Sequence, residues 1–218
     1  MTRFLIAAIL FVGLTAQTAS AQFGGMSLPS TGGGGLSAAE IDKFLAAATV
    51  ANKNMTDAEA ALYPLVVSKE KADEYNRKLA AALAIPDVKE RDAKVAELKK
   101  AAAEEVQKID PKDPAVVARL EKATPAQKSG LKDAIQKFLT AASADVALAL
   151  QGKKFVTQKP DLTAAAKVPE LTQAVKETVG QATAAVKLAG NLKTLATTAK
   201  IDIPADSFAK ITDTNFDA

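Results

Sequence analysis

The sequence predicts an all-α protein, an antiparallel up-and-down helical bundle of about five to seven helices with a flexible Gly-rich N-terminal arm. Small and apolar residues recur at steps of three and four, the spacing that keeps one helix face turned inward. Ser or Thr followed three positions later by Glu or Gln, a pattern typical of helix starts, recurs along the chain. More than a fifth of the residues are alanine, the strongest helix former, and no convincing strand pattern appears.

The longest regular pattern lies between Pro169 and Lys200, and it predicts a helix built to be packed against others. Its inward positions are small or apolar, and Val168, Val179, Val186, Leu188 and Leu195 widen the stripe. The central row consists of Leu171, Val175, Thr178, Ala182, Ala185, Ala189, Leu192, Ala196 and Ala199.

The first 21 residues resemble a secretory signal peptide in their order of charge and hydropathy. Arg3 supplies a positive start, Phe4 to Leu14 an apolar core, and Ala19-Ser20-Ala21 a small-residue cleavage site. The apolar run is too short to span a bilayer, which takes about 20 residues. We therefore expect export to the periplasm or the extracellular space, with no transmembrane segment after cleavage.

Three further regions follow the signal peptide. Residues 22–36 are rich in Gly and Ser and predict a flexible arm, because such a segment loses much entropy on ordering and buries little. Residues 37–200 hold the helical bundle domain, and residues 201–218 form a short C-terminal tail with an element around Ser207 to Ile211.

In the first half of the bundle, Ser37 and Glu40 predict the start of a helix that ends near Lys53. Thr56 with Glu59 predicts the start of a second helix. Because proline removes a backbone donor, we expect a kink or break at Pro64, a new start at Ser68 and an end before Pro86. A helix over 87–109 with about three heptads of apolar residues comes next.

In the second half, Asp113 and Pro114 predict a short helix to Lys122. Thr124, Pro125 and Gln127 mark the start of a longer helix that we expect to stop at Gly152, since glycine suits a left-handed helix cap. Residues 155–167 then connect to the long helix.

Composition limits the chemistry. With no histidine and no cysteine, the chain lacks His-based catalytic triads, zinc sites built on His or Cys, and disulfides. We therefore expect no enzyme, no catalytic residues, no cofactor and no metal. The formal net charge is +3 and positive and negative residues are mixed, so no nucleic-acid partner is expected.

The acidic residues have mostly simple interpretations. Glu59, Glu104 and Glu105 are expected on solvated helix faces, because a carboxylate di-metal bundle needs Glu-x-x-His motifs. The spacing in 213–217 matches the first three ligands of a calcium loop, but Ala218 replaces the turn glycine, so we expect an acidic terminus without bound metal. Tyr63 and Tyr75 are expected in the core.

These observations favour an exported, non-enzymatic helical bundle that acts as a structural, adaptor or chaperone-like interaction module. A protein partner or self-association is expected, although the sequence does not identify it. The alternative is a periplasmic or secreted carrier of an apolar small molecule or lipid. It predicts an apolar groove lined by Phe44, Leu79, Phe138, Leu139 and Val175.

Overall fold

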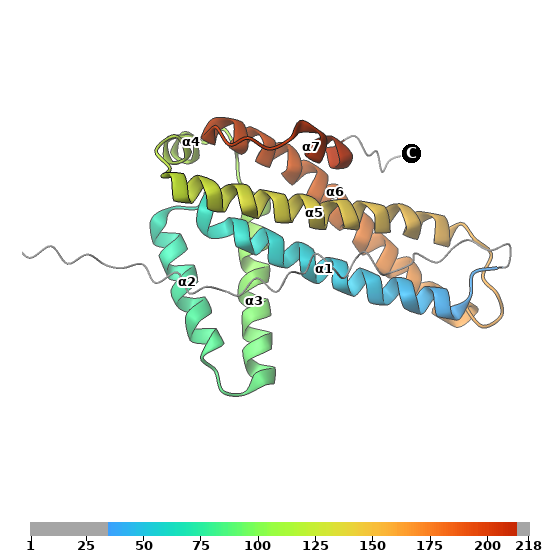
Figure 1. Ribbon diagram of the computed structural model, residues 1–218. Coiled ribbons are helices and arrows are strands. Elements are labelled where there is room, and N and C mark those ends of the chain that lie inside the picture. The colour runs from blue at the N-terminus through green and yellow to red at the C-terminus, as the bar shows by residue number, and fades with distance from the viewer. Residues whose placement is uncertain (1–34, 213–218) are drawn as a thin grey trace, which may run out of the picture. The chain divides into compact units, whose positions relative to one another are not determined.

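The computed structural model describes residues 35–212, which belong to one compact unit. The described chain is all α-helical, as expected, and folds as a helical bundle (Figure 1). Its seven α-helices are α1 (Ala38–Val66), α2 (Lys69–Leu83), α3 (Val88–Gln107), α4 (Pro114–Glu121), α5 (Pro125–Val156), α6 (Val168–Ala199) and α7 (Ala205–Thr212), with a short 3₁₀ helix, η2, at Ala165–Lys167.

The long helices α1, α5 and α6 pack together and form the core (Figure 1). A β-carbon added to Gly130 near the start of α5 would lie 3.8 Å from Leu65, and one added to Gly152 near its end would lie 2.8 Å from Phe44. Helix α5 therefore runs antiparallel to α1. Buried apolar side chains fall into two clusters, a larger one centred on residues such as Phe138 and Leu192, and a smaller one around Phe44 and Phe155.

The predicted helix starts are largely confirmed. Ser37 with Glu40 and Thr124 with Gln127 both form complete capping boxes. Asp113 caps α4 and Ser68 caps α2 through their side chains. These starts could be predicted because capping is local: the side chain satisfies backbone donors within the first turn of its own helix.

The predicted boundary near Lys53 is wrong. Helix α1 continues without interruption to Val66, so Thr56 and Glu59 lie inside it and start no helix. The helix also continues through Pro64 and ends two residues later, close to the break that proline predicts. Continuous burial of one face, including Ala51, Met55 and Leu62, accounts for the uninterrupted helix.

The predicted helix end at Gly152 is also wrong, since α5 continues to Val156. Gly152 is buried, and a β-carbon there would lie 2.8 Å from the Phe44 ring and 2.9 Å from Val175. The glycine therefore allows α5 to approach α1 and α6 closely. One turn later the Phe155 ring packs edge-on against Phe44, with ring centroids 5.8 Å apart.

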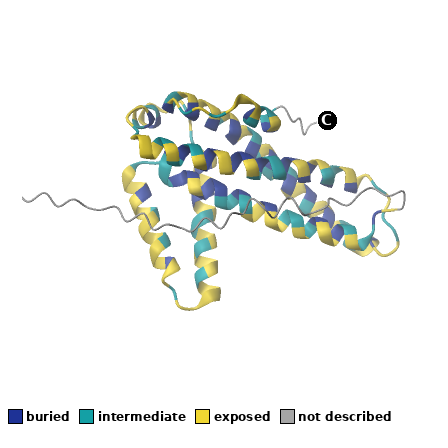
Figure 2. Cartoon of the chain, in the orientation of Figure 1, coloured by how far each residue is buried: buried dark blue, intermediate teal, exposed yellow. Residues whose placement is uncertain are grey.

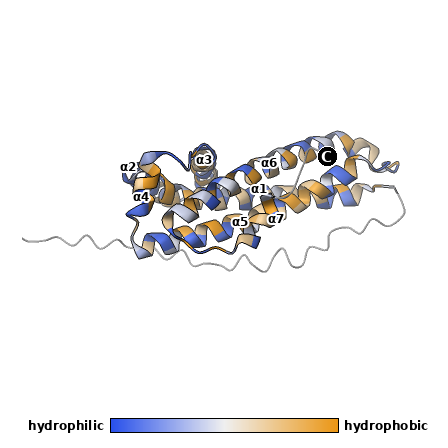
Figure 3. Ribbon diagram, turned by 90° about the horizontal axis from the view of Figure 1, so that it is seen from above, coloured by the Kyte–Doolittle hydropathy of each residue, from blue (hydrophilic) through white to orange (hydrophobic). Residues whose placement is uncertain are grey.

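Helices α2 and α3 form a hairpin that projects from the long helices (Figure 1). In the view turned by 90°, α3 is seen nearly end-on while α1, α5 and α6 run across the picture (Figure 3). The outer part of the hairpin is mostly exposed (Figure 2). Val88, an apolar residue at the start of α3, is 58% exposed, because α3 packs on the bundle only through its C-terminal half, at Ala102, Ala103 and Val106.

Both ends of the described chain pack on the bundle, and the element expected around Ser207 to Ile211 is confirmed as α7. Leu36, the last residue of the predicted arm, is buried, and its N–H donates to the carbonyl of Lys159 at 3.1 Å. In the predicted tail, Phe208 and Ile211 of α7 are buried in the larger cluster, against α5 and α6. The predicted signal peptide and most of the predicted arm lie outside the described residues.

Within residues 35–212, none of the helices combines the length and the hydropathy needed to cross a bilayer.

Substitution of Gly152 by alanine tests the close approach of α5 to its neighbours. Because the added methyl group overlaps Phe44 and Val175, we expect Gly152→Ala to lower the free energy of unfolding by about 1–3 kcal/mol. Gly190→Ala in α6 is the matched control. Apart from the adjoining backbone of its own helix, no atom lies within 4 Å of its added carbon, so we expect a gain of about 0.4–1 kcal/mol. Urea denaturation followed by circular dichroism measures both, and equal effects would contradict the packing described.

Candidate functional site

Two carboxyl side chains are buried inside the bundle. Glu59 of α1 is 3% exposed and Asp145 of α5 is 1% exposed. Acidic residues are rarely so buried unless a partner compensates for the lost hydration. The expectation that Glu59 lies on a solvated face is therefore wrong, whereas Glu104 and Glu105 are exposed as expected.

The two carboxyl groups differ in their hydrogen bonds. The amide of Gln107, at the end of α3, donates to both oxygens of Glu59, each at 3.0 Å. Neither oxygen of Asp145 has a hydrogen-bond partner among the described residues. A buried polar group in this state costs free energy, because its hydration is lost and nothing replaces it.

The antiparallel register of α1 and α5 brings the two side chains toward each other. The contacts of Gly130 and Gly152 place Asp145 close to the level of Ala51, roughly two helical turns before Glu59 on α1. Helical side chains lean toward the N-terminus of their own helix. In antiparallel helices Glu59 and Asp145 thus lean toward each other, near the level of the buried Met55.

Burial dominates the electrostatics of this pair. Burial raises the pKa of Glu59 to about 7, while the hydrogen bond from Gln107 favours the carboxylate and opposes this increase. Burial raises the pKa of Asp145 to about 7 as well, and the nearby negative charge of Glu59 adds to the effect. Both groups are therefore neutral in mildly acidic solution and become charged near neutrality.

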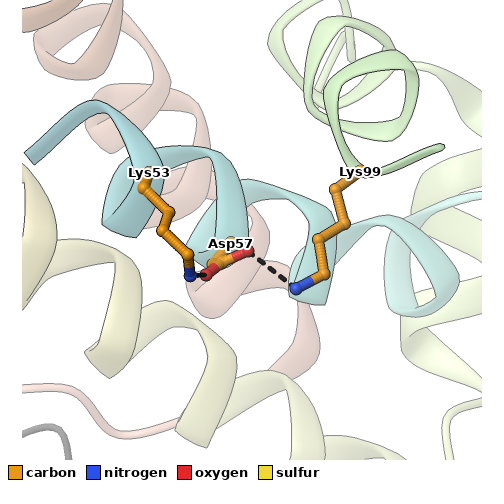
Figure 4. Close-up of polar contacts among 3 residues, drawn as sticks. All are labelled: Lys53, Asp57 and Lys99. Carbon is orange, nitrogen blue, oxygen red and sulfur yellow. Dashed lines mark hydrogen bonds and ion pairs between the residues drawn. The ribbon is translucent and has the colours of Figure 1, made fainter. Parts of the chain in front are cut away.

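Asp57, two residues before Glu59, provides a contrast. It lies at the α1–α3 contact and accepts bonds from Lys53 of its own helix at 2.6 Å and from Lys99 of α3 at 2.8 Å (Figure 4). Burial opposes its ionisation, but the two lysine contacts outweigh burial and lower its pKa. Asp57 is thus a charged group in a partnered site, whereas no lysine or arginine pairs with Glu59 or Asp145 among the described residues.

The buried pair has the properties of a proton-binding site. Its oxygens are shielded from solvent, so a substrate in solution has no direct access to them. Within residues 35–212, no three acidic, His or Cys side chains gather in a way that could hold a metal ion. The calcium-like spacing at 213–217 lies outside the described residues. The pair can gain and lose protons. Ionisation of either group is less unfavourable when water reaches the carboxyl oxygens.

The residues predicted to line an apolar groove lie in different places. Phe44 and Val175 meet in the smaller cluster, beside Gly152. Phe138 and Leu139 belong to the larger cluster. Leu79 lies half-buried on α2, in the projecting hairpin. Of these five residues, the structure brings together Phe44 with Val175 and Phe138 with Leu139. All four of these side chains are buried.

A groove of about 330 Å³ lies elsewhere, between α1 and α6. Hydroxyl, amide and carboxylate side chains make up most of its lining, which does not suit an apolar ligand. The lining consists of Leu45, Ala48, Thr49, Asn52, Glu170, Gln173, Ala174, Glu177, Thr178 and Gln181.

The positions of Glu59 and Asp145 within apolar stripes indicate that both are buried, although the overall composition gives no sign of it. Asp145 lies three residues after Ala142 and four before Ala149, on the inward face of α5, and Glu59 occupies the same kind of position between Met55 and Leu62 of α1. A carboxylate within an apolar stripe indicates a buried acid. Sequence reasoning missed Asp145 and treated Glu59 as a helix-start residue.

Comparison of the chain with protein-family models, with curated protein sequences and with solved structures finds no match.

Stability should fall as the pH rises through the titration of the pair. Below about pH 3 both carboxyl groups are protonated in the folded and the unfolded chain. Between about pH 3 and 7 the unfolded chain loses these protons while the folded chain keeps them, so higher pH favours unfolding. We therefore expect the wild-type free energy of unfolding to decrease from pH 5 to pH 8.

Asp145→Asn tests this expectation, because asparagine has nearly the shape of aspartic acid but does not ionise. At pH 8 the variant should be more stable than the wild type by on the order of 2 kcal/mol, and this advantage should shrink steadily as the pH is lowered to 4.5. Urea denaturation at several pH values measures it. Asp133→Asn, at an exposed position of the same helix, should follow the wild type. A wild type whose stability is independent of pH would contradict the assignment.

Proposed function

We propose that this protein is an exported, non-catalytic interaction module in which the α2–α3 hairpin contacts a protein partner. The observation that carries this proposal is the exposure of apolar side chains at the hairpin tip, where Leu83 is 51% and Val88 is 58% exposed. Between them lie the half-buried Ile85 and the exposed Pro86. An apolar tip on a projecting element is a typical feature of protein–protein contacts.

The free energy of folding gives a second argument. Ordering a residue costs about 1–2 kcal/mol of backbone entropy, which folding repays mainly by burying apolar surface. In α2 the buried residues are Ala72 and Ala82, which bury little surface. The outer half of the hairpin therefore adds little to the stability of the bundle, and binding offers a reason for its presence.

The root of the hairpin is better fixed than its tip. Lys99 pairs with Asp57 of α1, and the ring of Tyr75 packs edge-on against Tyr63 of α1 with centroids 5.2 Å apart. A firm root and an apolar tip hold a contact surface away from the bundle. The absence of histidine and the enclosure of the two buried acids support a role without catalysis.

The carrier of an apolar ligand has less support. The groove between α1 and α6 is polar, and four of the five residues predicted to line an apolar groove are packed in the core.

Site-specific crosslinking in the native host tests the proposed contact. A photoreactive phenylalanine analogue at Leu83 should crosslink to a discrete protein, because the tip is the proposed contact surface. The same analogue at Gln136, an exposed position of α5, is the control and should give at least tenfold less product. The double change Leu83→Asp with Val88→Asp should weaken the interaction with the captured protein by more than tenfold in a binding assay with both purified proteins. Equal crosslinking at both positions would overturn the proposal.

A further inference from the structure

We infer that the buried carboxyl pair Glu59–Asp145 makes the packing of the α2–α3 hairpin on the bundle depend on pH, through the protonation of these two groups. With both groups neutral the hairpin root is packed on α1, and with both ionised the end of α3 separates from α1 and admits water. This dependence on pH requires no partner, whereas its effect on the binding of a partner rests on the proposed function.

Charged side chains near the pair are already engaged in ion pairs. On α1 the other charged groups close to Glu59, Lys53 and Asp57, are paired with each other at the α3 contact. On α3, Lys99 is occupied by Asp57, and the neutral Gln107 faces Glu59.

Two more helices enclose the pair. On α5, the neighbours of Asp145 along the inward stripe are Ala142, Val146 and Ala149. On α6, all the buried residues are uncharged, among them Thr178, Ala182 and Ala185. No described positive charge therefore compensates a second negative charge in this place.

Two negative charges in such an environment repel each other and need water. The α1–α5 contact contains large side chains such as Met55, Phe138 and Leu139, so opening it exposes much apolar surface. At its contact with α1, helix α3 buries only Ala102, Ala103 and Val106, which cost less free energy to expose. Movement of α3 is the less costly response.

The hydrogen bonds indicate the same direction. Gln107 is exposed, and its amide donates both hydrogen bonds that Glu59 receives from described residues. Displacing this one side chain, at the last residue of α3, brings water to the carboxylate. The hairpin thus covers Glu59 through the side chain of Gln107.

The chain contains its own optical probe for this movement. It has two tyrosines and no tryptophan, and Tyr63 of α1 and Tyr75 of α2 contact each other at the hairpin root. Burial, with the nearby Asp57 and Tyr63, raises the pKa of Tyr75, so this phenol remains protonated up to pH 8.5. Tyrosine emission therefore reports on the junction in the full chain, without labels.

The experiment measures acrylamide quenching of tyrosine emission from pH 5 to pH 8.5 at constant ionic strength, with far-ultraviolet circular dichroism on the same samples. We expect the quenching constant of the wild type to rise at least twofold with a midpoint near pH 7, while the helical signal stays constant. Glu59→Gln and Asp145→Asn should each abolish most of the rise. Glu104→Gln, at an exposed position of α3, should behave like the wild type.

Two results would overturn the inference. One is a quenching constant that does not change with pH in the wild type, or that rises equally in both variants. The other is a loss of helical signal together with the rise, which would mean global unfolding and no local movement of the hairpin. If one variant fails to fold, the other still decides the outcome. Because no partner is used, a negative crosslinking result leaves this measurement unaffected.

Discussion

The antiparallel packing of α5 against α1 is the contact on which the rest of the described structure depends. Two glycines of α5 mark its register, Gly130 beside Leu65 and Gly152 in close contact with Phe44. At Gly152 the missing side chain lets three helices meet, since Val175 of α6 lies there too. This register also decides which side chains are enclosed together, because neighbouring helices present residues to each other at fixed levels. The burial of Asp145 within the electrostatic reach of Glu59 is one consequence.

The alanine content gives this bundle its particular energetics. Small side chains allow helices to approach closely but bury little apolar surface. Each helix–helix contact is therefore weaker than one formed by leucine side chains. The two buried acids lower the free energy of unfolding further, because burial removes their hydration. In such a protein a change of charge in the core has a large effect relative to the total stability, which for a domain is commonly only about 5–15 kcal/mol. An electrostatic event in the core is therefore able to alter which contacts persist.

The hairpin and the buried pair are connected through one side chain. Gln107 ends α3 and holds the carboxylate of Glu59, so the element that projects from the bundle is attached directly to one of the two buried acids. The triad of Lys53, Asp57 and Lys99 lies on the same junction and resists separation as a second, partly exposed tether (Figure 4). If the hairpin serves the proposed contact with a partner, this arrangement gives it a firm default position and, through the inferred ionisation of the pair, a means of release.

The sequence by itself determined the fold class and most helix starts. A start such as Ser37 with Glu40 is decided within one turn, by hydrogen bonds that local residues supply. Only the tertiary structure decided where α5 ends, since Gly152 reads locally as a stop and is held inside the helix by Phe44 and Val175. The projection of the hairpin and the enclosure of Glu59 and Asp145 also depend on which helices become neighbours. An inward position in one helix specifies burial, but the register between helices specifies the partner.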